Sequence, residues 1–130
     1  MGLPSILIVD DDPSTCEMIA KILRPAGYSV SCAGGAREAL QSLGRQPFDL
    51  VLTDIIMPEG DGFELIAALR DNHHAARVIV MSGGGRLDAE TYLSMARGFQ
   101  VDGLLRKPFT SEQLLDAIKP GGERSAVPSV

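Results

Sequence analysis

Short apolar runs alternate with amphipathic stretches along the 130 residues of this chain. Five of the runs have the length and the branched side chains typical of β-strands. They lie at residues 5–9, 28–33, 50–53, 77–82 and 103–108. Apolar residues at helical spacing follow each run and predict five helices, over residues 13–24, 36–44, 63–71, 87–97 and 110–119. The periodicity over 87–97 is weak and predicts a loosely held element. The run at 28–33 alternates apolar and polar residues, which predicts a more peripheral strand.

The alternation of five strands with five helices predicts an α/β fold. We expect a doubly wound parallel sheet of five strands, with right-handed crossovers and helices on both faces. A single domain should cover residues 3–119, and residues 120–130 should form a disordered polar tail that is too short for another element. In such a sheet, the carboxyl ends of all strands lie at one edge.

Three local signals place individual helices and their faces. Asp12-Pro13 is an N-cap followed by proline at the first helical position. Thr110 and Gln113 have the spacing of a capping box and predict the start of the last helix. In the second predicted helix, the spacing of the apolar residues predicts that Leu40 faces inward.

Composition and charge exclude several classes of function. The net charge of −5 argues against a nonspecific hold on nucleic acid. No apolar run approaches the length of a membrane span, and the first residues lack the basic start and apolar core of a signal peptide. Cys16 and Cys32 lack metal-like spacing, so we expect both to act as small buried hydrophobic residues in a reducing cytoplasm. The totals therefore predict a cytoplasmic domain.

Polar residues end four of the five apolar runs. Asp10-Asp11 follow the first strand, Asp54 ends the central one, Ser82 ends the fourth and Lys107 ends the fifth. Each of these residues could by itself be a helix cap or a solvated strand end. The adjacent Asp12 is explained in this way, as an N-cap. Since all strands of a parallel sheet end at one edge, the four positions converge there and form a candidate site.

The chemistry open to this group is narrow. Three carboxylates near one another repel and need a cation, and hard oxygen ligands suit Mg²⁺ or Mn²⁺. A carboxylate can also accept a phosphoryl group, and Asp54, alone on the central strand, is the best candidate nucleophile. Asp10 and Asp11 are better suited to the metal. Lys107 can neutralise phosphoryl oxygens, and Ser82 can donate a hydrogen bond to one of them.

On these residues the chain resembles the response-regulator receiver domains of two-component signalling. The resemblance extends from about Leu3 to Lys119, which is nearly the whole chain. It is carried by the motifs Ile6–Asp12, Asp54–Pro58 with Gly60–Gly62 behind it, Met81-Ser82 and Lys107–Phe109. All five functional positions of that family are present, in order and at the usual spacing.

The resemblance implies a flavodoxin-like (βα)5 sheet with strand order 2-1-3-4-5. It implies phosphorylation of Asp54 by a sensor histidine kinase or a phosphotransfer protein. Mg²⁺ would be bound by Asp11 and Asp54, with help from Asp10 and from the backbone carbonyl of Ile56. A cis peptide bond between Lys107 and Pro108 is also implied, and a cis bond before proline costs little.

The resemblance also implies how the signal leaves the domain. Partner binding would switch at the surface of the fourth helix, the fifth strand and the fifth helix, toward a downstream protein that the sequence does not identify. Such a domain catalyses its own phosphorylation and dephosphorylation but is not an enzyme with turnover. Homodimerisation stays open. No output domain follows Lys119, so we expect a stand-alone receiver or a fragment of a longer protein.

Two positions depart from the family pattern. Leu104 occupies the place of the aromatic residue that swings inward on phosphorylation, which removes the usual aromatic relay. Gly83–Gly85 gives the loop before the fourth helix unusual freedom. We therefore hypothesise that phosphate-dependent ordering of residues 83–97 carries the signal.

Three alternative functions compete with this interpretation. Asp10–Ser14 partly resembles the signature of haloacid-dehalogenase-type phosphatases, but that assignment leaves Asp54 unexplained and the chain has no room for a cap domain. A degenerate receiver that acts as a constitutive protein-binding module is favoured only by Leu104. A flavin-binding domain of the same fold would need a hydroxyl-rich phosphate loop after the first strand, which is absent.

Overall fold

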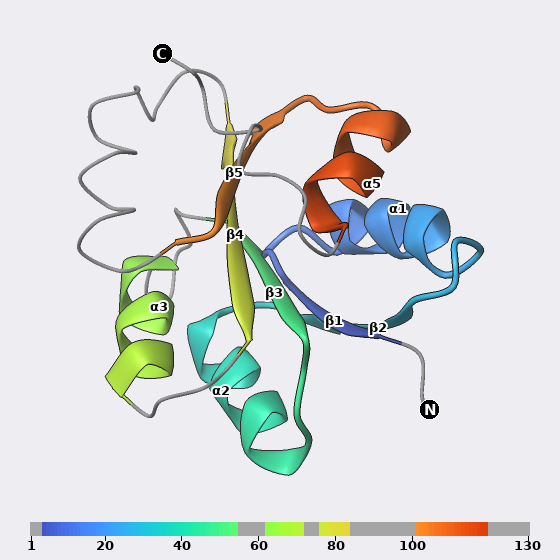
Figure 1. Cartoon of the computed structure of the whole chain (residues 1–130). Coiled ribbons are helices and arrows are strands. Elements are labelled where there is room, and N and C mark those ends of the chain that lie inside the picture. The colour runs from blue at the N-terminus through green and yellow to red at the C-terminus, as the bar shows by residue number, and fades with distance from the viewer. Residues whose placement is uncertain (1–3, 55–61, 72–75, 84–100, 120–130) are drawn as a thin grey trace.

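The computed structural model of the chain describes residues 4–54, 62–71, 76–83 and 101–119. They form five strands and four helices (Figure 1). In chain order these are β1 (Ser5–Val9), α1 (Pro13–Leu23), β2 (Ser29–Ala33), α2 (Ala36–Arg45), β3 (Leu50–Asp54), α3 (Gly62–Asp71), β4 (Arg77–Gly83), β5 (Gly103–Lys107) and α5 (Ser111–Ile118). The helix predicted over 87–97 and the tail at 120–130 lie outside the described residues.

All neighbouring strands pair in parallel, in the order β2-β1-β3-β4-β5. This is the predicted flavodoxin-like order. β3 lies at the centre because its residues pair with β1 on one side and with β4 on the other. Its first four residues are buried, as expected for a strand covered on both faces. β2 is an edge strand with mixed burial, which confirms its predicted peripheral position.

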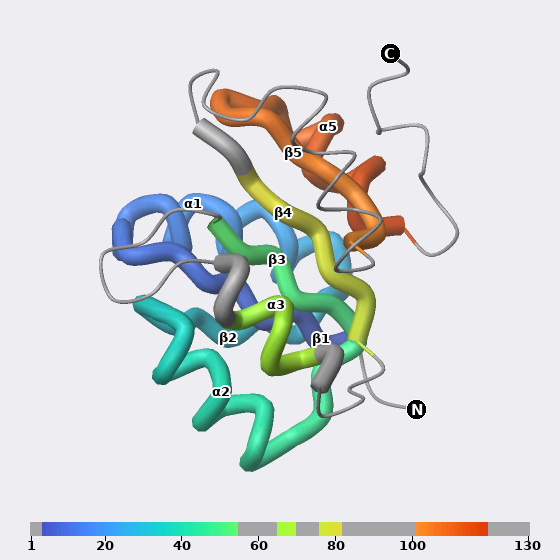
Figure 2. The backbone as a smooth tube through the Cα atoms, turned by 90° about the vertical axis from the view of Figure 1, so that its left-hand side faces the viewer, coloured from blue at the N-terminus to red at the C-terminus, as the bar shows by residue number. Residues whose placement is uncertain are grey.

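The alternation of side chains along the strands divides the core into two layers. In β1, Leu7 and Val9 belong to the cluster that packs with α2 and α3, whereas Ile6 and Ile8 belong to the cluster with α1 and α5. Figure 1 shows these two helix pairs on opposite sides of the sheet. Figure 2, turned by 90°, shows α3 in front of the strands. Apolar burial on both faces therefore fixes the sheet between the helices.

The predicted helix caps are present. The Asp12 carboxylate accepts hydrogen bonds from the Ser14 N–H at 3.0 Å and from the Ser14 hydroxyl at 2.7 Å. Thr110 and Gln113 form the capping box of α5, with bonds of 3.0 and 2.9 Å. These bonds satisfy backbone donors that a helix start leaves without intrahelical partners. Local chemistry thus places the start of both helices.

Two predictions of burial are wrong. Leu40 is 36% exposed, because the buried stripe of α2 runs through Ala36, Ala39 and Leu43 and leaves Leu40 at its flank. Cys32 is exposed, whereas Cys16 is buried as expected. Cys32 lies near the end of the edge strand, where neighbours cover a side chain on fewer sides than in a central strand.

Among the helices that the structure describes, none combines the length and the apolar character needed to cross a membrane.

Candidate functional site

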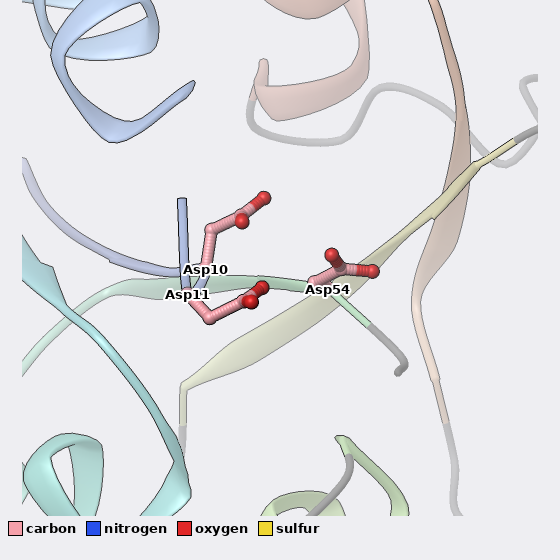
Figure 3. A group of neighbouring side chains, drawn as sticks. All are labelled: Asp10, Asp11 and Asp54. Carbon is pink, nitrogen blue, oxygen red and sulfur yellow. The ribbon is translucent and has the colours of Figure 1, made fainter. Parts of the chain in front are cut away.

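The carboxylates of Asp10, Asp11 and Asp54 gather at the carboxyl edge of the sheet (Figure 3). Each offers one oxygen, and these oxygens all lie within 4.8 Å of one another. The strand register accounts for the meeting: Val9 of β1 pairs with Thr53 of β3, so Asp10 and Asp54 directly follow a matched pair. The predicted convergence of these three residues is therefore present.

Lys107 completes the cluster from the last strand. Its Nζ donates to Oδ2 of Asp10 at 2.8 Å and to Oδ2 of Asp54 at 3.3 Å. β4 lies between β3 and β5, so the lysine side chain must reach past the end of β4 to make these bonds. The exposed fraction of the side chain is 26% for Lys107, 15% for Asp54 and 1% for Asp10. Asp54 is thus the more accessible of the two carboxylates bonded to the ammonium.

The charges of the cluster do not cancel. Three carboxylates and one ammonium leave these four side chains with a net charge of −2. Burial by itself lowers the pKa of Lys107, but the hydrogen bond to Asp10 and the charges of Asp54 and Asp10 raise it above its ordinary value of 10.5. Lys107 therefore stays protonated at neutral pH, and the remaining negative charge favours a divalent cation.

Backbone contacts hold Asp10 in place. Its N–H donates to the Ala33 carbonyl of β2 at 3.1 Å, and its Oδ1 accepts from the Asp12 N–H at 2.9 Å. The thiol of Cys16 donates to the Asp10 carbonyl at 3.8 Å. In contrast, Asp11 is exposed. Asp10 is thus a buried, oriented carboxylate, while Asp11 is exposed and Asp54 is partly exposed.

Thr53 is a contributor that the sequence analysis did not identify. It is fully buried, and its hydroxyl donates to the backbone carbonyl of Asp54 at 2.8 Å. A buried hydroxyl in an otherwise apolar strand was the available signal, because such a group requires a hydrogen-bond partner. This bond fixes the backbone at Asp54, the last residue of β3.

The donor set fits a hard divalent cation. Mg²⁺ binds oxygen ligands at about 2.0–2.1 Å, so opposite ligands on one ion are about 4.2 Å apart. The carboxylate oxygens of Asp10, Asp11 and Asp54 lie within 4.8 Å of one another and would draw closer on binding one ion, since adjacent ligands are about 3 Å apart. Ile56, whose carbonyl was predicted as a further ligand, lies outside the described residues. Asp10, Asp11 and Asp54 are therefore the ligands that the described structure offers.

The remaining predicted site residues lie at the same edge. Ser82 is in β4 and pairs with Arg106 of β5, one position before the pair of Gly83 with Lys107. The backbone of Ser82 therefore lies one register position from the strand position of Lys107. The side chain of Ser82 is outside the described part of the chain. The peptide bond between Lys107 and Pro108 is cis, as the resemblance implied.

One family model matches most of the chain. A model described as "Response regulator receiver domain" matches residues 6–119. Among curated relatives, the transcriptional activator protein PfeR of Pseudomonas aeruginosa is 36% identical over 111 residues, which cover 85% of this chain and 35% of the relative. The CpxR homolog of Haemophilus influenzae, a transcriptional regulatory protein, is 32% identical over 127 residues, which cover 98% of this chain and 54% of the relative. The chain thus spans about a third to a half of the length of these relatives.

Solved structures give the same result for the fold. The chemotaxis protein CheY4 of Vibrio cholerae superposes with a TM-score of 0.80 at 30% identity, covering 88% of this chain and 94% of the other. A CheY-like response regulator receiver domain protein from Methanospirillum hungatei gives a TM-score of 0.81 at 31% identity, covering 90% of this chain and 91% of the other. Both similarities extend over nearly the whole chain.

Proposed function

The chain belongs to the response regulator receiver domain family, and from this premise we propose that Asp54 accepts a phosphoryl group from a sensor histidine kinase or a phosphotransfer protein. Receiver domains are regulatory domains. The observation that carries the proposal is the ammonium of Lys107, which bonds both the buried Asp10 and the more accessible Asp54. This arrangement holds positive charge beside the carboxylate that would react.

The transfer balances with Asp54 as the nucleophile. One carboxylate oxygen of Asp54 forms a bond to phosphorus while the bond from phosphorus to the donor imidazole nitrogen breaks. That bond's electron pair stays on the nitrogen, and because the other ring nitrogen of the donor carries a proton, the donor leaves as neutral imidazole. Lys107 is placed to stabilise negative charge on the phosphoryl oxygens, and Ser82 is proposed to donate a hydrogen bond to one of them. Asp10 orients Lys107 through the 2.8 Å bond.

Mg²⁺, with Mn²⁺ as a substitute, is the proposed cofactor. Asp11 and Asp54 would hold it, together with Asp10 and the backbone carbonyl of Ile56. Three carboxylates with a net charge of −2 after pairing with Lys107 support this assignment. When bound, the ion neutralises charge on the phosphoryl oxygens and on the carboxylates around them.

The rest of the proposal concerns the signal and its partners. We place the receiver at residues 3–119, a disordered tail at 120–130 and the protein in the cytoplasm. Leu104 is buried in the core cluster that packs with α2 and α3, which supports a switch without an aromatic relay. The output surface would comprise residues 87–97, β5 and α5, and would bind an unidentified protein partner. Ordering within residues 83–97, of which Gly83 already pairs in β4 with Lys107 of β5, would carry the signal.

The test is intact mass after incubation with a small acyl phosphate and Mg²⁺. We expect one added phosphoryl group on the wild-type chain and none on Asp54→Asn or without metal. Asp49→Asn, which changes a carboxylate at the opposite edge of the sheet, is the matched control and should be phosphorylated normally. No addition to the wild type would favour a constitutive binding module. Addition to Asp54→Asn would move the nucleophile to Asp10–Asp12 and favour the phosphatase alternative.

A further inference from the structure

The two cysteines of this chain lie together beside the acidic cluster. Cys16 belongs to the buried stripe of α1, and Cys32 lies in β2 on the same sheet face as Val30. That face packs against α1, which turns the two side chains toward each other. The side chains are close enough for Cys32 to raise the pKa of the Cys16 thiol, and both line one surface hollow. Residues far apart in sequence thus form a close thiol pair.

A surface hollow gives solvent access to the pair. It has a volume of about 490 Å³, and both thiols line it. Cys32 is exposed, whereas Cys16 is buried behind it. The charged side chains that line the hollow are Asp10, Asp11, Glu17, Arg24 and Glu38. A small oxidant therefore reaches the sulfur of Cys32 first.

The surroundings give the two sulfurs different roles. Cys32 is exposed at the hollow, so it is the sulfur that solvent and a small oxidant can reach. Burial, followed by the hydrogen bond and charge of Cys32, raises the pKa of Cys16 to about 12. Cys16 is buried behind Cys32, so it is the sulfur that closes the bond and not the one that meets the oxidant first.

We propose that Cys16 and Cys32 form a peroxide-sensitive thiol pair that closes to an intramolecular disulfide. The Cys32 sulfur attacks one oxygen of hydrogen peroxide, the O–O bond breaks, and Cys32 becomes a sulfenic acid as one water leaves. The Cys16 sulfur then attacks the Cys32 sulfur, and the S–O bond breaks. The Cys16 proton leaves with the hydroxyl group as a second water. Two thiols lose two electrons, and one peroxide is reduced to two waters.

The disulfide forms between two side chains that line the same hollow. Their sulfurs must approach to the roughly 2.0 Å of a disulfide bond. Cys16 also gives up its contact with the Asp10 carbonyl, which lies 3.8 Å away. The modification does not depend on phosphorylation, so it stands or fails separately from the role proposed for Asp54.

The experiment is intact mass of the reduced full chain before and after hydrogen peroxide, followed by N-ethylmaleimide in denaturant. The untreated chain should take two maleimides. The oxidised chain should lose the mass of two hydrogens and take none, and dithiothreitol should restore both sites. Peptide mapping should then find residues 16 and 32 in one cross-linked species.

Two variants separate a pair from two independent thiols. Cys16→Ala leaves the exposed Cys32 without a partner, so peroxide should add oxygen to it instead of removing hydrogen. Cys32→Ser keeps the buried Cys16, which should retain its maleimide site. Circular dichroism verifies that each variant is folded, and the exposed Cys32→Ser supplies the comparison if Cys16→Ala unfolds. The proposal is overturned if the wild type keeps both maleimide sites, gains only oxygen or forms a dimer through Cys32.

Discussion

The two edges of the sheet treat their charged residues differently. At the amino edge, the Asp49 carboxylate accepts from the Ser5 N–H at 2.7 Å, and Asp102 accepts from the Val78 N–H at 2.7 Å. Arg77 donates to the Ile118 carbonyl at 3.0 Å. Each of these three charged residues contacts backbone groups of a neighbouring element and so stabilises the packing of strands and α5.

At the carboxyl edge, charged side chains contact one another. Asp10 and Asp54 share the ammonium of Lys107, and Asp11 lies in the same group of carboxylates. Like charges at this distance repel, so the cluster lowers stability relative to a neutral arrangement. At the amino edge, the three charged side chains have hydrogen-bond partners in the backbone. At the carboxyl edge, negative charge remains in excess, and such charge is suited to binding a ligand. The difference supports the proposal that the site lies at the carboxyl edge.

The largest effect should come from removing the ammonium. Lys107→Met should slow phosphorylation by acyl phosphate by about 10²–10³-fold, the range found when one group that stabilises developing negative charge is lost. The measurement is the time course of the phosphorylated mass. Arg106→Met is the matched control, because Arg106 is the exposed neighbour of Lys107 on β5 and should leave the rate unchanged. A loss smaller than tenfold in Lys107→Met would contradict the role given to the ammonium.

The second prediction concerns the metal. Mg²⁺ binding should raise the stability of the chain, and a change at the carboxyl edge should abolish this rise, whereas a change at the amino edge should not. Mg²⁺ should stabilise the wild type by about 2.7 kcal/mol at a concentration of 100 times its Kd, because binding to the folded state alone shifts the unfolding equilibrium. The check is thermal unfolding across a MgCl₂ titration. Asp11→Asn should largely abolish the rise in Tm, and Asp49→Asn should retain it. An equal rise in both variants would show that the ion acts elsewhere.

The smallest predicted effect is on the free energy of unfolding, which two Asp→Asn variants should change in opposite directions. In metal-free buffer, Asp54→Asn should raise the free energy of unfolding by about 1 kcal/mol, since it removes repulsion with two carboxylates at the loss of one bond to Lys107. Asp49→Asn should lower it by about 0.5 kcal/mol, since it weakens a charge-assisted bond to the Ser5 N–H. Urea unfolding measures both.

High salt provides the control for this comparison. Screening should reduce both changes, because each arises from charge at a partly or wholly exposed site. If both Asn variants change stability in the same direction, the contrast between the two edges is wrong.

Most of the secondary structure was predictable because its causes are local. Asp12 and Thr110 cap their helices through bonds to residues two or three positions away, which sequence spacing alone reveals. Leu40 and Cys32 were assigned to the interior incorrectly. The exposure of Leu40 depends on how wide the buried face of α2 is. The exposure of Cys32 depends on the place of its strand at the edge of the sheet. Neither is a local property of the sequence.

The sequence by itself determined the alternation of strands and helices, and with it the edge at which Asp10, Asp54 and Lys107 end their strands. A periodic pattern determines which residues share a face, so these conclusions needed no coordinates. Only the tertiary structure decided that Lys107 reaches past β4 to a carboxylate 97 positions away, and that Cys16 meets Cys32. Such contacts depend on strand register and on helix packing across a sheet, which arise only when distant segments bury apolar surface together.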